Sequence, residues 1–104
     1  MAQAVLRIEG LPEGALDAAA RFHSEWLPTA RALLLDPGGD LVLVFPPADY
    51  THRGWRLAAV QDLAREATPR RVNAIAGDDE RAIAETVAWL AQAPGITGQL
   101  VAVG

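Results

Sequence analysis

The chain has 104 residues, of which 51% are hydrophobic, and its formal net charge is −4 at pH 7. This length suits one domain with a single core, and this composition favours a packed globule over a disordered chain. With a negative net charge, we expect no extended basic surface that could bind the phosphates of a nucleic acid.

The absence of two residue types, cysteine and lysine, excludes several kinds of functional site. The chain has no cysteine, which excludes disulfides and thiolate metal or redox sites and fits a cytoplasmic location. All nine basic residues are arginines, so no mechanism that needs a lysine amine is open. The first residues lack a charged stretch followed by an apolar one, and no apolar run approaches the roughly 20 residues that span a bilayer. We therefore expect neither a signal peptide nor a membrane segment.

The first half of the chain predicts a strand, a helix and a second strand. Residues 5–8 form a short apolar run that ends at a turn rich in glycine and proline. From residue 12 apolar side chains recur at helical spacing. Pro28 should kink or interrupt this helix before it resumes through residues 30–34, because proline removes a hydrogen bond and crowds the preceding turn. Residues 41–45 are continuously apolar, which is typical of a parallel strand covered on both faces.

The second half predicts two further helices and two further strands. A helix should run from residue 50 or 51 to residue 67, followed by a strand over residues 72–76. Asp78 or Asp79 can cap the next helix, and residues 100–103 form the last strand. The apolar stripes of these helices consist of Leu57, Val60, Leu63 and Ala64 in the first and Ile83, Val87 and Leu90 in the second.

The order β-α-β-α-β-α-β predicts a single α/β domain over residues 1–104, with four parallel strands in the order 1-2-3-4 and three helices. Right-handed crossovers in this order would place all three helices on one face of the sheet. The other apolar face would then be bare to water. Either one helix crosses to that face or another subunit covers it, and we expect a partner surface in both cases.

Two segments resemble the last strands of the short-chain dehydrogenase/reductase (SDR) family. They are residues 71–77, Arg-Val-Asn-Ala-Ile-Ala-Gly, and the Thr-Gly-Gln turn before residues 100–103. Residues 63–66 resemble the end of the family's catalytic-tyrosine helix, and residues 83–91 resemble its last helix. The resemblance covers nearly the whole chain but only about half of a family member. It implies a truncated, half-Rossmann relative.

The catalytic groups that this resemblance would imply are not at their expected positions. The glycine-rich phosphate loop has no counterpart. The family uses a tyrosine followed four residues later by a lysine. Here Gly54 stands four residues after Tyr50, the only tyrosine, and the other register places Asp49 and Arg53 at the two positions. Two prolines stand where the serine belongs. We therefore expect a protein that is not an enzyme, with no catalytic residues, no cofactor and no metal site.

Most other polar residues have structural explanations. His23 and His52 have no further ligand at a metal-binding spacing. The acidic residues 78–80 suit the positive end of a helix. Arg70 and Arg71 are interpreted as a solvated turn before a strand rather than a phosphate clamp.

A small ligand-binding or enzymatic domain is the alternative function. Asp49, Tyr50 and Arg53 follow the second strand, at the edge where open α/β sheets bind ligands. Such a site would use the loops from Pro46 to Arg53 and from Gly77 to Glu80.

The preferred hypothesis is a non-catalytic domain that acts through protein–protein association. Trp26, Trp55 and Trp89 fall one to each predicted helix, and tryptophan is enriched at interface hot spots. The alternative is that they fill the core. The strand at residues 5–8 also presents an open sheet edge. We expect a homo-oligomer or docking on a full-length SDR-like protein, with no nucleic acid and no membrane as partner.

Overall fold

The structure is a computed structural model that describes residues 3–36 and 38–104. Within these ranges four strands alternate with three helical segments, as predicted. No helix in the described part of the chain is both long enough and apolar enough to cross a bilayer. In chain order the elements are β1 (Gln3–Arg7), α1 (Ala15–Arg21), the π-helical turn η1 (Phe22–Trp26), α2 (Leu27–Leu35), β2 (Asp40–Phe45), the 3₁₀ turn η2 (Tyr50–His52), α3 (Arg53–Ala67), β3 (Val72–Ala76), α4 (Glu80–Ala91) and β4 (Leu100–Ala102).

The strands form one parallel sheet in the order β1-β2-β3-β4, which confirms the predicted topology. In β2 every residue after Asp40 is buried, because β2 lies inside the sheet and both of its faces are covered. This burial explains its unbroken apolar sequence.

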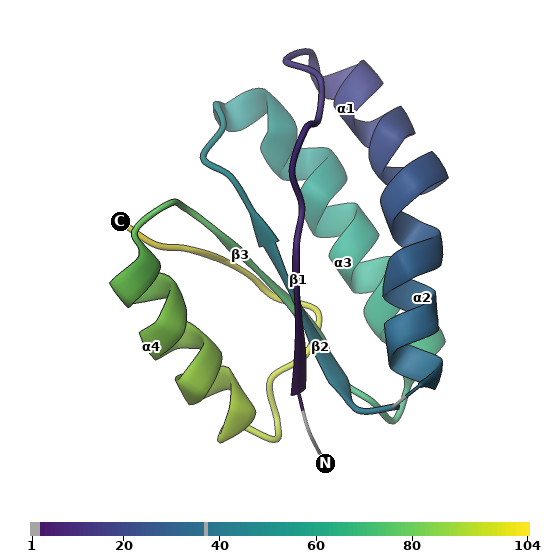
Figure 1. The fold of residues 1–104 in the computed structure, drawn as a ribbon, viewed down its shortest axis with the longest axis vertical. Helices are drawn as coiled ribbons and strands as arrows, with labels where there is room; N and C mark the ends of the chain where they lie inside the picture. Colours follow the sequence, from purple (N-terminus) through teal and green to yellow (C-terminus); the bar gives the residue numbers. More distant parts are fainter. Residues whose placement is uncertain (1–2, 37) are drawn as a thin grey trace.

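The helices cover both faces of the sheet. Figure 1 shows α2 and α3 on one side of the strands and α4 on the other. Along β2, Leu41, Leu43 and Phe45 belong to the core under η1, α2 and α3, whereas Val42 and Val44 belong to the core under α4. The last helix therefore crosses to the opposite face, which is one of the two solutions that the sequence left open. Because the strand order is sequential, the β3–α4–β4 connection has the opposite hand to the two connections before it.

The helical path from Ala15 to Leu35 continues across Pro28. The backbone N–H of Leu27 donates to the carbonyl oxygen of Phe22, five residues earlier, so the turn before the proline is a π turn. This wider turn makes room for the proline ring, which would otherwise press on the carbonyl four residues before it. The predicted interruption is thus a change in hydrogen-bond pattern, and the α-helix resumes at Leu27, earlier than predicted.

Arg71 joins three elements at the N-terminal edge of the sheet. Its backbone N–H donates to Asp40 Oδ1 at 2.7 Å, and its Nη2 lies 3.0 Å from Asp40 Oδ2. Its Nη1 donates to the carbonyl oxygens of Leu90, Ala93 and Ile96 at the end of α4 and beyond it. The side chain is only 13% exposed. The interpretation of Arg71 as part of a solvated turn is therefore wrong, because its partly buried side chain connects β2, the start of β3 and the end of α4.

Candidate functional site

A cavity of about 480 Å³ opens at the C-terminal edge of the sheet. One side is lined by the loop after β2 and the first turns of η2 and α3, through residues 47–50, His52, Arg53 and Arg56. The other side is lined by residues 76–78, at the end of β3 and after it, and by Leu100 and residues 102–104. Parallel strands bring their C-terminal ends to the same edge, so loops that are distant in sequence meet there.

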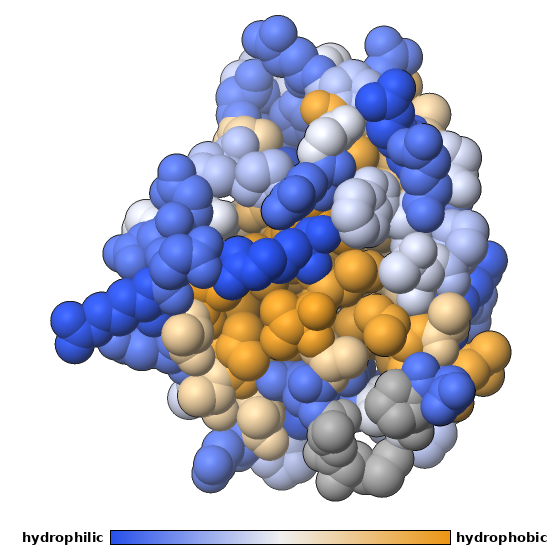
Figure 2. All heavy atoms as spheres, in the orientation of Figure 1, coloured by the Kyte–Doolittle hydropathy of each residue, from blue (hydrophilic) through white to orange (hydrophobic). Residues whose placement is uncertain are grey.

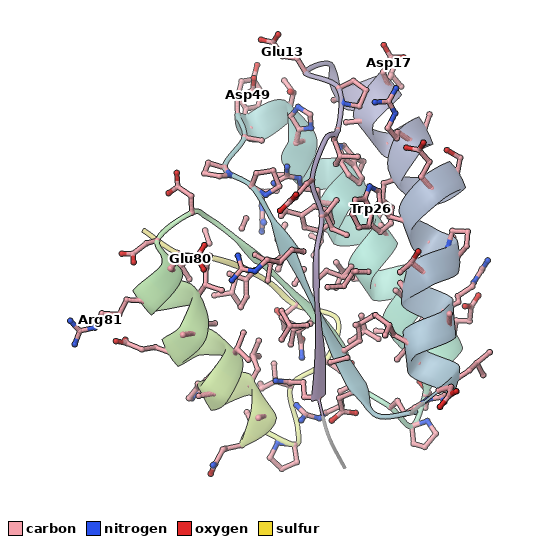
Figure 3. All side chains as sticks on the ribbon, in the orientation of Figure 1. Glu13, Asp17, Trp26, Asp49, Glu80 and Arg81 are labelled. Carbon is pink, nitrogen blue, oxygen red and sulfur yellow. The ribbon has the colours of Figure 1, made fainter. Side chains whose placement is uncertain are left out.

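The three predicted site residues, Asp49, Tyr50 and Arg53, all line this cavity. Asp49, labelled in Figure 3, caps the start of η2 and accepts hydrogen bonds from the hydroxyl and the backbone N–H of Thr51. These two bonds hold the pKa of the Asp49 carboxyl below its ordinary value. Tyr50 is 88% exposed, and Arg53 is also exposed at the first residue of α3. The predicted loop after β2 therefore does contribute to a cavity, although Asp49 is already engaged as a cap.

The second predicted loop contributes only its first half. Gly77 and Asp78 line the cavity, whereas Glu80 begins α4 and pairs with Arg7 of β1 at 2.7 Å. A β-carbon on Gly77 would lie 2.6 Å from Val103 Cγ2 and 2.7 Å from the Val103 carbonyl oxygen. Only glycine lets the turn after β3 approach the end of β4 this closely, so it sets the shape of this wall.

His52 is a buried brace in this structure. Its side chain is 5% exposed. Its Nε2 lies 2.8 Å from the carbonyl oxygen of Glu13, and its Nδ1 accepts a hydrogen bond from Trp55 Nε1 at 3.1 Å. A carbonyl requires a donor and an indole N–H requires an acceptor, so these partners place the single proton on Nε2. Both ring nitrogens are engaged, and neither is free to accept a substrate proton or to ligate a metal.

Arg56 is the residue of this site that sequence reasoning missed. It is 5% exposed and lies between the main cavity and a smaller one of about 350 Å³ that residues 10–13 help to line. Its Nη1 donates to the carbonyl oxygen of Pro46 at 2.9 Å. Its guanidinium carbon lies 4.7 Å from the centre of the Phe45 ring and 5.8 Å from that of Trp55. The signal was present in the sequence, because position 56 stands four residues before Val60 and seven before Leu63, on the buried stripe of the helix.

The buried guanidinium of Arg56 lacks a counter-ion within the described residues. Its Nε is shielded from solvent and has no hydrogen-bond partner, and none of the ion pairs in the described part of the chain includes Arg56. Burial lowers the pKa of this guanidinium, because removal from water disfavours the charged form. The π faces of Phe45 and Trp55 offset part of this cost.

The fold and the sequence agree on the family. The family model SDR-like, described as short chain dehydrogenase-like protein, matches residues 6–103. The chain therefore belongs to the SDR-like family, as its sequence motifs predicted. No curated protein and no solved structure matches the chain.

A second surface surrounds the edge strand β1. The backbone N–H of Ile8 donates to the carbonyl oxygen of Val44, so alternate residues of the strand point their backbone groups toward β2. Those of Gln3, Val5 and Arg7 consequently point away from the sheet. This strand therefore presents backbone donors and acceptors along its outer edge.

Apolar side chains gather around this outer edge. Figure 2 shows an apolar patch on this side of the molecule, over β1 and between α4 and α2, with hydrophilic side chains around it. Val5 is 42% exposed and lines a shallow groove with Ile83, Ala84, Val87 and Ala88 of α4. Ala84 and Ala88 have small side chains, so the groove leaves space beside the strand. We call β1 and this groove the β1 edge surface.

The three tryptophans differ in how much surface they expose. Trp26 and Trp55 are half-buried and pack against the larger core, and Figure 3 shows Trp26 on the side of the helical segment that faces β1. The Trp55 ring centre lies 5.6 Å from those of Phe22 and Phe45. Trp89 on α4 is 56% exposed. Packing against the core thus explains the position of Trp26 and Trp55. An interface role for the three tryptophans stays a prediction.

Proposed function

We propose that this SDR-like chain is a non-catalytic domain that acts through association, forming a homo-oligomer through the β1 edge surface. The observation that carries the proposal is the edge strand with outward-facing backbone groups beside an exposed apolar groove. Such an edge pairs readily with another strand, and an apolar patch around it adds to the free energy of association.

The sequence of β1 suits pairing with a second copy of itself. In an antiparallel pair about a two-fold axis at Val5, the outward N–H and C=O groups of Val5 in each copy bond to those of the other. Gln3 then stands opposite Arg7, so no like charges face each other across the axis. The same surface serves both copies, as a two-fold interface requires. The small side chains of Ala84 and Ala88 leave room for the partner's Val5.

The side chains at the family's catalytic positions support a non-catalytic role. The register that matches residues 63–66 to the family places Asp49 where the tyrosine belongs. Its lowered pKa leaves it ionised at neutral pH, with no proton to donate. Arg53 stands where the lysine belongs, and a guanidinium keeps its proton at any physiological pH. This pair cannot reproduce proton transfer by a tyrosine beside a lysine.

Light scattering of the purified chain across a concentration series tests the association. We expect a mass of twice the monomer that falls toward the monomer on dilution. Val5→Lys places two charges opposite each other at the axis and should give a monomer throughout. Leu16→Lys is the matched control, because Leu16 is 88% exposed on α1, away from β1, and it should leave the dimer unchanged.

A wild-type chain that is monomeric at every concentration would contradict self-association. If that monomer bound an added full-length SDR protein, docking on a family relative would replace the homo-oligomer. Equal dissociation of the Val5→Lys and Leu16→Lys variants would show that the association does not use the β1 edge surface.

A further inference from the structure

We infer that the cavity at the C-terminal edge of the sheet binds a small organic carboxylate, and that Arg56 receives its carboxylate group. This binding is independent of the association proposed above, because the β1 edge surface and the cavity share no residue. The cavity of about 480 Å³ has the size of a small-molecule site, for which about 300–1,000 Å³ is usual.

The Arg56 guanidinium has hydrogen-bond donors without partners and no counter-ion within the described residues. A buried cation is costly unless a counter-charge and hydrogen bonds compensate for the lost water. Here Pro46 satisfies Nη1 alone, and Nε has no partner. The nearby acidic residues are committed elsewhere or lie at the cavity rim. Asp49 caps η2, Glu13 is exposed and meets His52 only through its backbone, and Asp78 is exposed. No carboxylate in the described part of the chain pairs with Arg56, so an anion bound from solution would supply the missing counter-charge.

Nη1 is held by Pro46, whereas Nε and Nη2 have no hydrogen-bond partner among the residues that the structure describes. Because Nε is shielded from solvent in this structure, a carboxylate that meets both donors has to displace the groups that cover Nε. The two N–H groups on the side of Nε and Nη2 are parallel, and they match the two oxygens of a carboxylate in a bidentate pair. The Phe45 and Trp55 rings hold the guanidinium plane in place, so less side-chain entropy is lost on binding.

Charged side chains of both signs line the cavity. Arg53 and Arg56 stand three residues apart on α3 and both line it, close to the positive end of the helix. Asp49 and Asp78 lie at its rim and oppose a ligand of high negative charge. This balance favours a small acid with one carboxylate over polyphosphates.

Benzoate is a suitable probe because its planar carboxylate is attached to an apolar ring. We would follow the Arg56 Nε–H resonance by NMR while benzoate is added, with sodium chloride of equal ionic strength as the control. We expect a saturable shift of this resonance with benzoate and none with chloride. The same titration with inorganic phosphate separates a carboxylate site from a general oxyanion site.

A variant pair then assigns the effect to the guanidinium fork. Arg56→Lys keeps a charge but loses the paired donors, and we expect benzoate affinity to fall about tenfold. Arg65→Lys makes the same exchange at an exposed position of α3 and should leave the affinity unchanged. If Arg56→Lys does not fold, the wild-type resonance still decides the question.

Three results would overturn the inference. The Arg56 resonance could stay fixed through the benzoate titration, phosphate could saturate the site at lower concentration than benzoate, or Arg65→Lys could weaken benzoate as much as Arg56→Lys does.

Discussion

Each end of the sheet holds one arginine that is withdrawn from solvent, fully for Arg56 and partly for Arg71, and the two differ in what surrounds them. At the N-terminal edge, Arg71 contacts the Asp40 carboxylate and three carbonyl oxygens. At the C-terminal edge, Arg56 has one carbonyl and two aromatic rings, and its Nε has no partner. A buried charged side chain whose hydrogen-bond donors all have acceptors stabilises the fold. A buried charged side chain that has unpaired donors beside a cavity can bind a ligand there.

The largest loss of stability should follow from removing the Arg71 guanidinium at the N-terminal edge of the sheet. Arg71→Met leaves the Asp40 carboxylate, 23% exposed, without its guanidinium partner and frees three carbonyl groups, whereas the bond from the backbone N–H of residue 71 remains. We expect a loss of about 3 kcal/mol in the free energy of unfolding, because one half of a largely buried pair remains uncompensated. Urea unfolding followed by circular dichroism measures it.

The matched control for Arg71→Met is Arg81→Met. The Arg81 side chain is 90% exposed and pairs with Glu85 one turn along α4, and Figure 3 shows it pointing away from the molecule. Its loss should cost less than about 0.5 kcal/mol. A similar change in both variants would mean that the contacts of Arg71 contribute little to stability.

A second variant tests whether the cavity side of the sheet is also closely packed. Gly77→Ala would place its β-carbon 2.7 Å from the Val103 carbonyl oxygen, which is backbone and has little freedom to move. We expect a loss of about 1–3 kcal/mol from overpacking. Gly54→Ala is the control, because a β-carbon there meets nothing within 4 Å and alanine favours a helix. An unchanged unfolding midpoint for Gly77→Ala would show that the cavity wall yields easily.

The difference between the two edges was only partly predictable from the sequence. Apolar runs and turn residues identified all four strands, their order and the loop that contains Asp49, Tyr50 and Arg53. These features depend on local periodicity and on the geometry of parallel sheets. The crossing of α4 was left open because the right-handed rule favours the other face, and only the packing of Ile83 and Leu90 against Val42 and Val44 decides it.

The roles of the buried polar residues could not be predicted in the same way. Arg71 appeared solvated because its partners, Asp40 and the carbonyls after α4, lie 19 to 31 residues away in sequence. Arg56 was overlooked because arginine on an apolar stripe is usually assigned to solvent. His52 depends on Glu13 and Trp55, and tertiary contacts of this kind have no local signature. Their roles become visible only when the hydrogen-bond partners are known.

A third variant tests the role of Arg56 at the C-terminal edge of the sheet. Arg56→Met replaces the buried guanidinium with an apolar side chain of similar length. Since no ion pair is lost, we expect the free energy of unfolding to change by about 1 kcal/mol or less in either direction. Urea unfolding beside Arg71→Met gives the comparison. A loss as large as that of Arg71→Met would show that Arg56 is itself a structural clasp, and would remove the contrast between the two edges.

The smallest effect should come from the Asp49 cap at the cavity rim, and it depends on pH. The folded-state pKa of Asp49 is lowered by Thr51, so its ionised form stabilises the fold above the ordinary aspartate pKa of about 4. That contribution disappears as the pH falls through the lowered folded-state value. The stability difference between wild type and Asp49→Asn should thus be small and constant at neutral pH, and should shrink below about pH 4. Thermal unfolding over a pH series measures it, with the exposed Asp17→Asn variant as a control for net charge. A difference that persists unchanged into acid would mean that the Asp49 charge has no part in the cap, and that the cavity rim is held by neutral hydrogen bonds alone.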